Sequence, residues 1–432
     1  MSCYGYGKLI TPHLDDLARE GVLFSNVHTP NPFTEPAFTS LYTGMYPTRH
    51  GIVSHGSSRA LDPAIKLLPE VLGYAGLHTG AVDNLARWKG WFQRGFLEYV
   101  DPDPTTAPIH ADARSVNEAL FGWLERNHDV DFFLVVHYWD PHAPYLPPED
   151  HDLFGPSERP EPFPWRQHLR EPLASFFFEH FLTPDTSLEE AIAAYDGEIN
   201  CVDKHVGDLI GALRYWGILE DTVVIITSDH GESLGEHGIF FDHHGLYETT
   251  TRVPLIIYGP GRIPAGIRID APVVSVDIPL TLLDLAGIRD VGFVRQAQGR
   301  SLLPLVQGEG SQDGGRPIFL SESTWQSKRA ILHGKWKLIR SIQQDVYGNP
   351  PCELYDLASD PAETRNLYAE HPALAADLEE RLSRWVQEQS PNGDPLMLQG
   401  CSKRLHPYTL QQEAEVLERV EEPDTEGEGG QA

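Results

Sequence analysis

Short apolar runs alternate along the chain with longer segments whose apolar positions recur at helical spacing. The runs at 131–139 (DFFLVVHYW) and 222–230 (TVVIITSDH) are apolar at successive positions, and a third run at 252–261 (RVPLIIYGPG) ends in Gly and Pro. Successive apolar positions are typical of strands that are covered on both faces. The alternation with helical segments predicts an α/β fold with a mostly parallel sheet flanked by helices.

The clearest helical segment is 187–213, which has one apolar stripe along its length. It opens with Ser187 and Glu190, which have the spacing of a capping box. A further helix is expected at 277–287, where apolar residues again recur at helical spacing.

The pattern changes after about residue 310, where a Gly-rich stretch precedes three short β-like runs and a helix-like segment at 371–389. The β-like runs follow one another closely enough to be antiparallel. We therefore predict three parts: a catalytic α/β domain at 1–310, an α+β subdomain at 311–395 and a weakly structured acidic tail at 396–432.

The chain has 432 residues and a formal net charge of −30, from 33 basic and 63 acidic residues. This charge argues against nucleic acid and anionic membranes as partners. No apolar run is long enough to span a bilayer, and MSCYGYGKL lacks the basic and apolar regions of a signal peptide, which favours the cytoplasm. The four cysteines have no metal-binding or redox spacing. The sequence leaves the oligomeric state open.

The stretch NPFTEPAFTSLYTGMYPTRH at 31–50 places Thr34 just before a helix expected at 36–42. Gly44 and Pro47 then close that helix. The amino end of a helix suits an anion, and also a hydroxyl group that attacks one. The alternative is that Thr34 only caps the helix.

Other reactive side chains follow the predicted strands, where α/β proteins bind their ligands. Asp229 and His230 end one strand, and a carboxylate beside an imidazole suits Zn or Mn. Another strand is followed by His137, Asp140 and His142, and a later loop is also rich in histidine, with His237, Asp242, His243 and His244.

These segments together resemble the sulfatase family of the alkaline-phosphatase superfamily. The resemblance extends from Ser2 to about Gln389, with its motifs in the family's order. The segments that carry it are 11–26, 34–51, 140–148, 227–238, 246–257, 334–340 and 353–367.

The resemblance implies a hydrolase of a small anionic ester and a divalent metal ion, which could be Zn, Mn or Ca. It assigns Asp229 and His230 as metal ligands, with Thr34 touching the metal. His142 and His243 would then be catalytic groups that contact the substrate or protonate the leaving group. Asn84 stands where many sulfatases have a lysine and would bind substrate, as would His244, because the alignment there is good to about one residue.

One departure concerns the nucleophile, which in typical sulfatases is a Cys or Ser in the pattern Cys-x-Pro-x-Arg that is converted to formylglycine. Here Thr34 takes that position and Phe38 replaces the arginine. Superfamily relatives that cleave phosphate esters use an unmodified Ser or Thr. We therefore expect Thr34 to be an unmodified nucleophile, with phosphate or phosphonate esters favoured over the alternative, sulfate esters.

A second departure is that family members begin with an apolar strand ending in metal-binding aspartates, whereas this sequence starts just after that point. Asp15 and Asp16 come too late in the pattern to replace them. We expect the reading frame to extend upstream by about 15–25 residues, enough for one strand and its flanking turns. A truncation that is real would instead favour a non-catalytic relative that binds an anion or a partner.

Overall fold

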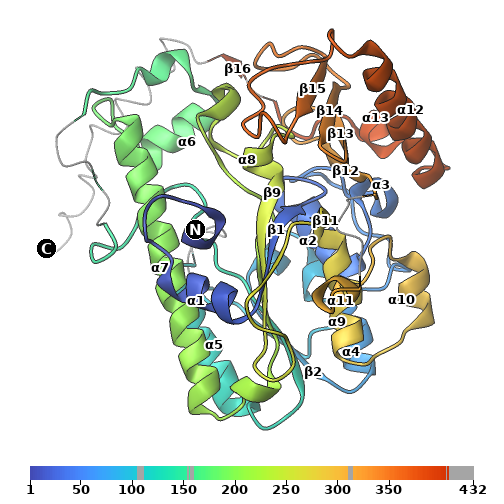
Figure 1. Ribbon diagram of the computed structural model, residues 1–432. Helices are drawn as coiled ribbons and strands as arrows, with labels where there is room; N and C mark the ends of the chain where they lie inside the picture. Colours follow the sequence, from blue (N-terminus) through green and yellow to red (C-terminus); the bar gives the residue numbers. More distant parts are fainter. Residues whose placement is uncertain (105–110, 153–154, 156–159, 310–314, 405, 408–432) are drawn as a thin grey trace, which may run out of the picture.

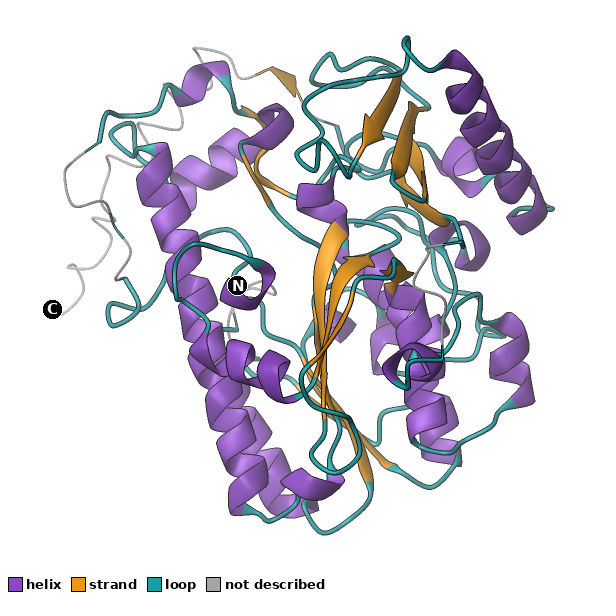
Figure 2. Cartoon of the chain, viewed as in Figure 1, coloured by secondary structure: helices purple, strands orange, loops and turns teal. Residues whose placement is uncertain are grey.

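The computed structural model describes residues 1–104, 111–152, 155, 160–309, 315–404 and 406–407. Figure 1 shows an α/β body whose strands stand between two groups of helices, with the C-terminal antiparallel sheet at one end. Figure 2 shows the same two helical layers in purple. One layer contains α1 (Pro12–Glu20), α5 (Ala113–Asn127) and α7 (Leu188–Tyr215), and the other contains α2 (Thr34–Thr43), α4 (Leu68–Tyr74), α9 (Ile278–Leu285), α10 (Val291–Gln296) and α11 (Leu303–Val306).

Most described strands of the body fall into two separate sheets, apart from short two-stranded pairs. In the larger sheet the order is β10-β1-β9-β6 with β11 also on β1, and β9 is antiparallel to both its neighbours while β1 is parallel to β10 and β11. The smaller sheet, β3-β2-β4, is wholly parallel. The strands are β1 (Val22–His28), β2 (His78–Val82), β3 (Glu98–Val100), β4 (Phe132–Val136), β6 (Val224–Thr227), β9 (Arg252–Tyr258), β10 (Ile267–Ile269) and β11 (Val273–Val274). The predicted α/β class is confirmed.

The predicted helices are also present. The Ser187 hydroxyl accepts the Glu190 N–H at 3.1 Å and the Glu190 carboxylate accepts the Ser187 N–H at 2.8 Å, which is the expected capping box. The apolar strands β4 and β6 are shorter than the runs that predicted them, because the polar residues at their carboxyl ends leave the sheet and enter loops.

A groove of about 1590 Å³ separates β4 from β6. Among the described residues, β4 pairs only with β2 and β6 pairs only with β9, so the facing edges of both strands have no strand partner. Apolar side chains of α2, α5 and α7 cover the groove, and residues 1 and 4–6 also line it. This groove, the strand groove, has the apolar faces and open edges that surround a buried central strand.

We expect an apolar strand of about six residues, joined to the amino side of Met1, to fill the strand groove and pair with both edges. Burial of its side chains should raise the free energy of unfolding by about 3 kcal/mol or more after the cost of ordering it. Hydrogen exchange on β4 and β6 should slow, whereas an added Gly/Ser/Asp segment of equal length should change neither quantity. Unchanged exchange on β4 and β6 after addition of the apolar strand would contradict this expectation.

The C-terminal subdomain is the predicted antiparallel sheet with a helix. The strand order is β12-β13-β14-β15, and Leu378 and Leu382 of the long helix are buried in the same apolar cluster as the sheet. The elements are β12 (Ile318–Glu322), β13 (Lys328–His333), β14 (Trp336–Ser341), β15 (Cys352–Asp356) and α12 (Pro372–Gln389).

The segment after α12 is more ordered than the sequence indicates, over the part that is described. Helix α13 (Pro395–Gln399) buries Leu396, and the backbone N–H of Lys403 donates to the Thr324 carbonyl at 2.9 Å. The expected tail at 396–432 therefore includes ordered residues, and most of its remainder, 408–432, lies outside the described residues. No helix in the described ranges is both long enough and apolar enough to cross a membrane.

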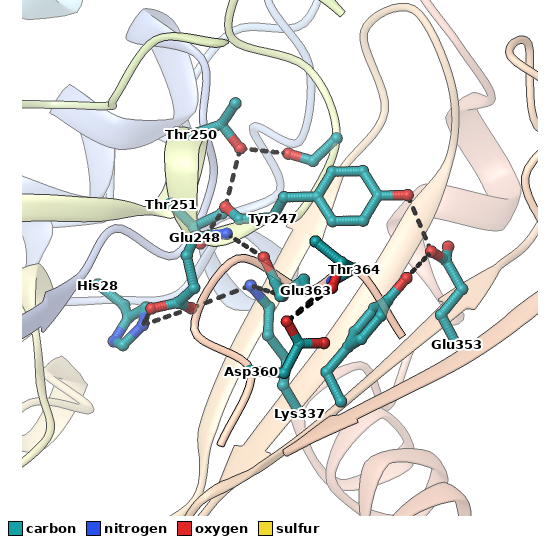
Figure 3. Close-up of polar contacts among 12 residues, drawn as sticks. His28, Tyr247, Glu248, Thr250, Thr251, Lys337, Glu353, Asp360, Glu363 and Thr364 are labelled. Carbon is teal, nitrogen blue, oxygen red and sulfur yellow. Dashed lines mark hydrogen bonds and ion pairs between the residues drawn. The ribbon is translucent and has the colours of Figure 1, made fainter. Parts of the chain in front are cut away.

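Buried ion pairs join the subdomain to the α/β body, as Figure 3 shows. The ammonium of Lys337, on β14, lies 3.0 Å from Glu248 of α8 (Glu248–Thr251) and 2.9 Å from Glu363. Glu248 also contacts the imidazole of His28, at the end of β1, at 3.0 Å. Lys337 is fully buried, so these charges depend on one another for their compensation.

Replacing Lys337 by methionine should lower the free energy of unfolding by about 3–5 kcal/mol, because it leaves two buried carboxylates without their cation. Urea denaturation measures the change. Lys335 is the matched control, since its ion pair with Asp356 is half exposed and Lys335→Met should cost about 1 kcal/mol or less. An equal loss of unfolding free energy in the two variants would mean that the buried ion pairs do not stabilise the contact between the subdomain and the α/β body.

Candidate functional site

The candidate site lies where the amino end of α2 meets the loops after β4 and β6. Helix α2 begins at Thr34, two residues before the expected start, and Phe33 occupies the N-cap position. Thr34 is therefore the first helical residue rather than the N-cap, and no side-chain hydrogen bond caps this helix. Its side chain is buried, with 4% of the residue exposed.

Three predicted site histidines come together beside this helix start. The rings of His230 and His243 stack with their centres 3.8 Å apart, and His142 lies 5.5 Å from His243 and 6.2 Å from His230. Phe33, which directly precedes Thr34, packs edge-on against His243 at 4.7 Å. The fold thus gathers residues from three distant parts of the sequence at one place.

The choice between His243 and His244 depends on what each ring contacts. His244 has one ring nitrogen 2.9 Å from the Tyr347 hydroxyl and the other 3.3 Å from Asp242, so it is held between the loop and the C-terminal subdomain. His243 is the ring that stacks on His230. His243 thus belongs to the histidine cluster and His244 to a contact with Asp242 and Tyr347, and the catalytic role of His243 and the substrate contact of His244 stay predictions.

Asn84 is buried behind the cluster, with 2% of the residue exposed. Its side-chain oxygen accepts the indole N–H of Trp139 at 2.7 Å, and Trp139 in turn packs against His142 at 5.8 Å. The structure therefore connects Asn84 to the cluster through Trp139. His137, a further candidate, is held by Asp83 at 2.8 Å.

Burial dominates the electrostatics of the cluster. Burial and, to a smaller extent, the nearby His230 lower the pKa of His142 to about 4. Burial likewise lowers the pKa of His243 well below its usual value. For Asp242 burial alone would raise the pKa, but the imidazoles of His244 and His243 outweigh it and lower the pKa.

The predicted metal ligands Asp229 and His230 lie side by side, with 3.5 Å between a carboxylate oxygen and Nε2 of the imidazole. Nδ1 of His230 lies 2.9 Å from the Gly231 carbonyl, which assigns the proton to Nδ1 and leaves a lone pair on Nε2. Two lone-pair donors that face each other suit a divalent cation. Within the described residues, however, no group of three or more His, Cys, Asp or Glu side chains has metal-binding geometry, so Asp229 and His230 have no third such ligand beside them.

Several charged residues beside Thr34 were not identified from the sequence. Glu35 is buried and lies 3.9 Å from the ammonium of Lys89, and burial raises the pKa of this carboxyl to about 7 although Lys89 acts against the rise. Lys403 approaches the same region from the far end of the chain. Glu35 stands inside the Thr34 motif and could have been noticed there, whereas no local pattern identifies Lys403.

Two comparisons of the sequence bear on the family. The family described as Sulfatase matches residues 1–288, and the one described as N-sulphoglucosamine sulphohydrolase, C-terminal, matches residues 235–389. A choline-sulfatase of Rhizobium meliloti is 28% identical, with 88% of this chain and 83% of that protein covered. An N-acetylglucosamine-6-O-sulfatase of Bacteroides thetaiotaomicron is 26% identical, with 91% and 85% covered.

Solved structures share the fold. One, in complex with its substrate D-glucosamine-2-N,6-O-disulfate, has a TM-score of 0.75 and 23% identity, with 91% of this chain and 96% of that chain covered. The phosphonate monoester hydrolase of Agrobacterium radiobacter has a TM-score of 0.71 and 22% identity, with 90% and 93% covered. The family match over two thirds of the sequence shows that the chain belongs to the sulfatase family.

Proposed function

We propose that this sulfatase-family hydrolase uses Thr34, without modification, to cleave small phosphate or phosphonate esters. The family's enzymes act on sulfuric or phosphoric ester bonds, and are generally dependent on a divalent metal ion. The observation that carries the proposal is the position of Thr34, a buried hydroxyl at the first residue of α2 beside the histidine cluster. A threonine has no route to formylglycine, so its own oxygen must attack.

The start of α2 supplies a place for the anion. Pro36 has no N–H and the N–H of Ala37 donates to the Phe33 carbonyl, so the N–H groups of Thr34 and Glu35 are those at the helix end. These donors and the helix dipole stabilise the charge of the transferred group. The buried position excludes most water from the attacking oxygen.

In the proposed reaction Oγ1 of Thr34 forms a bond to phosphorus as the bond to the leaving alcohol breaks. The neutral imidazole of His142 or His243 accepts the proton that Oγ1 loses and gives it to the departing oxygen. Water then attacks the phosphorus of the Thr34 ester. This step restores the Thr34 hydroxyl and releases the phosphate or phosphonate. A divalent ion held by Asp229 and His230 would supply Lewis-acid stabilisation of the anion and lower the pKa of the attacking hydroxyl.

Direct hydrolysis of sulfate esters by Thr34 is the second candidate. The two curated relatives described above are named as sulfatases, which favours sulfate, whereas the phosphonate monoester hydrolase shares only the fold. Rates on matched aryl phosphate, phosphonate, phosphodiester and sulfate esters separate the two candidates. Faster turnover of sulfate would overturn the proposal, and background rates on every ester, with anion binding retained, would favour a non-catalytic relative.

A further inference from the structure

The segment after α13 is fixed beside the candidate site by backbone contacts. The N–H of Lys403 donates to the Thr324 carbonyl at 2.9 Å, and the Ser402 hydroxyl donates to the His55 carbonyl at 2.7 Å. The N–H of His55 in turn donates to the Thr324 hydroxyl at 3.0 Å. Hydrogen bonds thus hold residues 402–403 against the two loops that contain His55 and Thr324.

The side chain of Lys403 lies between Trp325 and the loop at Gly56. Its ammonium is 4.8 Å from the ring centre of the buried Trp325, and its Cε would lie 3.6 Å from a Cβ placed on Gly56. The backbone of Gly56 donates to the carboxylate of Glu35, the neighbour of Thr34. Lys403 therefore lies one loop away from the proposed nucleophile.

No carboxylate of the described residues forms an ion pair with Lys403. Burial lowers the pKa of Lys403, while the more distant carboxylates of Asp242 and Glu35 act in the opposite direction. A partly buried cation without a contacting anion is a good place for an anion to bind.

A row of aromatic rings connects this cation to the histidine cluster. His55 packs against Trp88 at 5.0 Å, Trp88 against Trp139 at 5.3 Å, and Trp139 against His142 at 5.8 Å. Lys89 follows Trp88 and adds a second ammonium, which donates to the Ser57 carbonyl. The surroundings are therefore aromatic and cationic, although the chain as a whole carries a net charge of −30.

We propose that Lys403 is a specificity residue that binds a second anionic group of the substrate. The preferred substrate is then a dianionic ring compound, with its ester at Thr34 and a carboxylate, sulfate or phosphate group at Lys403. His55 and Trp88, two partly exposed members of the aromatic row, offer apolar surface to the ring between the two anions. This inference rests on the proposed function for the position of the ester, but not for the binding of the second anion.

The test compares 4-nitrophenyl phosphate with its ring-carboxylated analogue on the wild type and on Lys403→Met. A charge-assisted contact of this kind should raise KM for the carboxylated ester by about 10-fold or more in the variant, with kcat little changed and the plain ester unaffected. Lys403→Arg should recover most of the loss, and Lys335→Met, in an exposed pair on the C-terminal subdomain, is the control. Equal effects on the two esters, or no effect on either, would overturn the proposal.

A binding measurement keeps this test separate from the proposed function. Phenylphosphonate and carboxyphenylphosphonate have no ester bond, so calorimetric titration measures their affinities whether or not the chain cleaves esters. The wild type should bind the carboxylated compound about 10-fold more tightly, and Lys403→Met should remove that difference. Equal affinities of the wild type for the two compounds would overturn the role of Lys403, whereas a failure of turnover alone would count against Thr34 chemistry.

Discussion

Thr34→Ala is expected to lower kcat/KM for phosphate esters by about 10³-fold or more, because it removes the atom that forms the covalent intermediate. Intact mass of the peptide that contains Thr34 should show an unmodified threonine. The remaining rate would come from the helix end and the histidine cluster, which bind and stabilise the anion without a nucleophile. Steady-state kinetics on an aryl phosphate measures the loss.

The preference for phosphate follows from the same hydroxyl. A threonine sulfate has no carbonyl-hydrate route for release, so water must displace it directly. A phosphate intermediate carries more negative charge and gains more from the helix end as that charge redistributes in the transition state. Thr34→Ser keeps an attacking oxygen and is the matched control, which should retain most of the activity. A fully active Thr34→Ala enzyme would show that the nucleophile has been misidentified.

Loss of Asp229 or His230 is expected to abolish binding of a divalent metal ion, with little effect on the fold. Both side chains follow the end of β6 and lie outside its apolar core, so neither should be needed for the sheet to form. Elemental analysis and calorimetric titration with Zn²⁺, Mn²⁺ and Ca²⁺ on Asp229→Ala and His230→Ala measure the change. Thermal unfolding of the metal-free proteins checks the fold.

Asp221→Ala provides the control for these variants, because Asp221 lies at the other end of the same strand and is largely exposed. It should leave metal content unchanged. Unaltered stoichiometry in both Asp229→Ala and His230→Ala would remove the pair from the ligand shell. Loss of metal in one variant alone would identify that residue as the ligand that the ion requires.

The sequence predicts the elements of this fold better than it predicts the contacts between them. The capping pair Ser187–Glu190 and the apolar runs of β4 and β6 are local signals, and each is found where it was expected. The different contacts of His243 and His244 could not be predicted in this way, since the partner of His244 is Tyr347, about 100 residues away. Lys403 lay beyond sequence reasoning for the same reason, because its place is set by a backbone hydrogen bond to Thr324, which is distant in the sequence.

The strand groove has a thermodynamic consequence for the candidate site, which spans it. His142 follows β4 on one side and His230 follows β6 on the other, and no backbone ladder among the described strands ties these two sides together. A strand that fills the groove and an anion that binds between His142 and His230 therefore both act on the distance between β4 and β6. By linkage, filling the groove tightens binding of the anion by the factor by which the anion tightens filling of the groove.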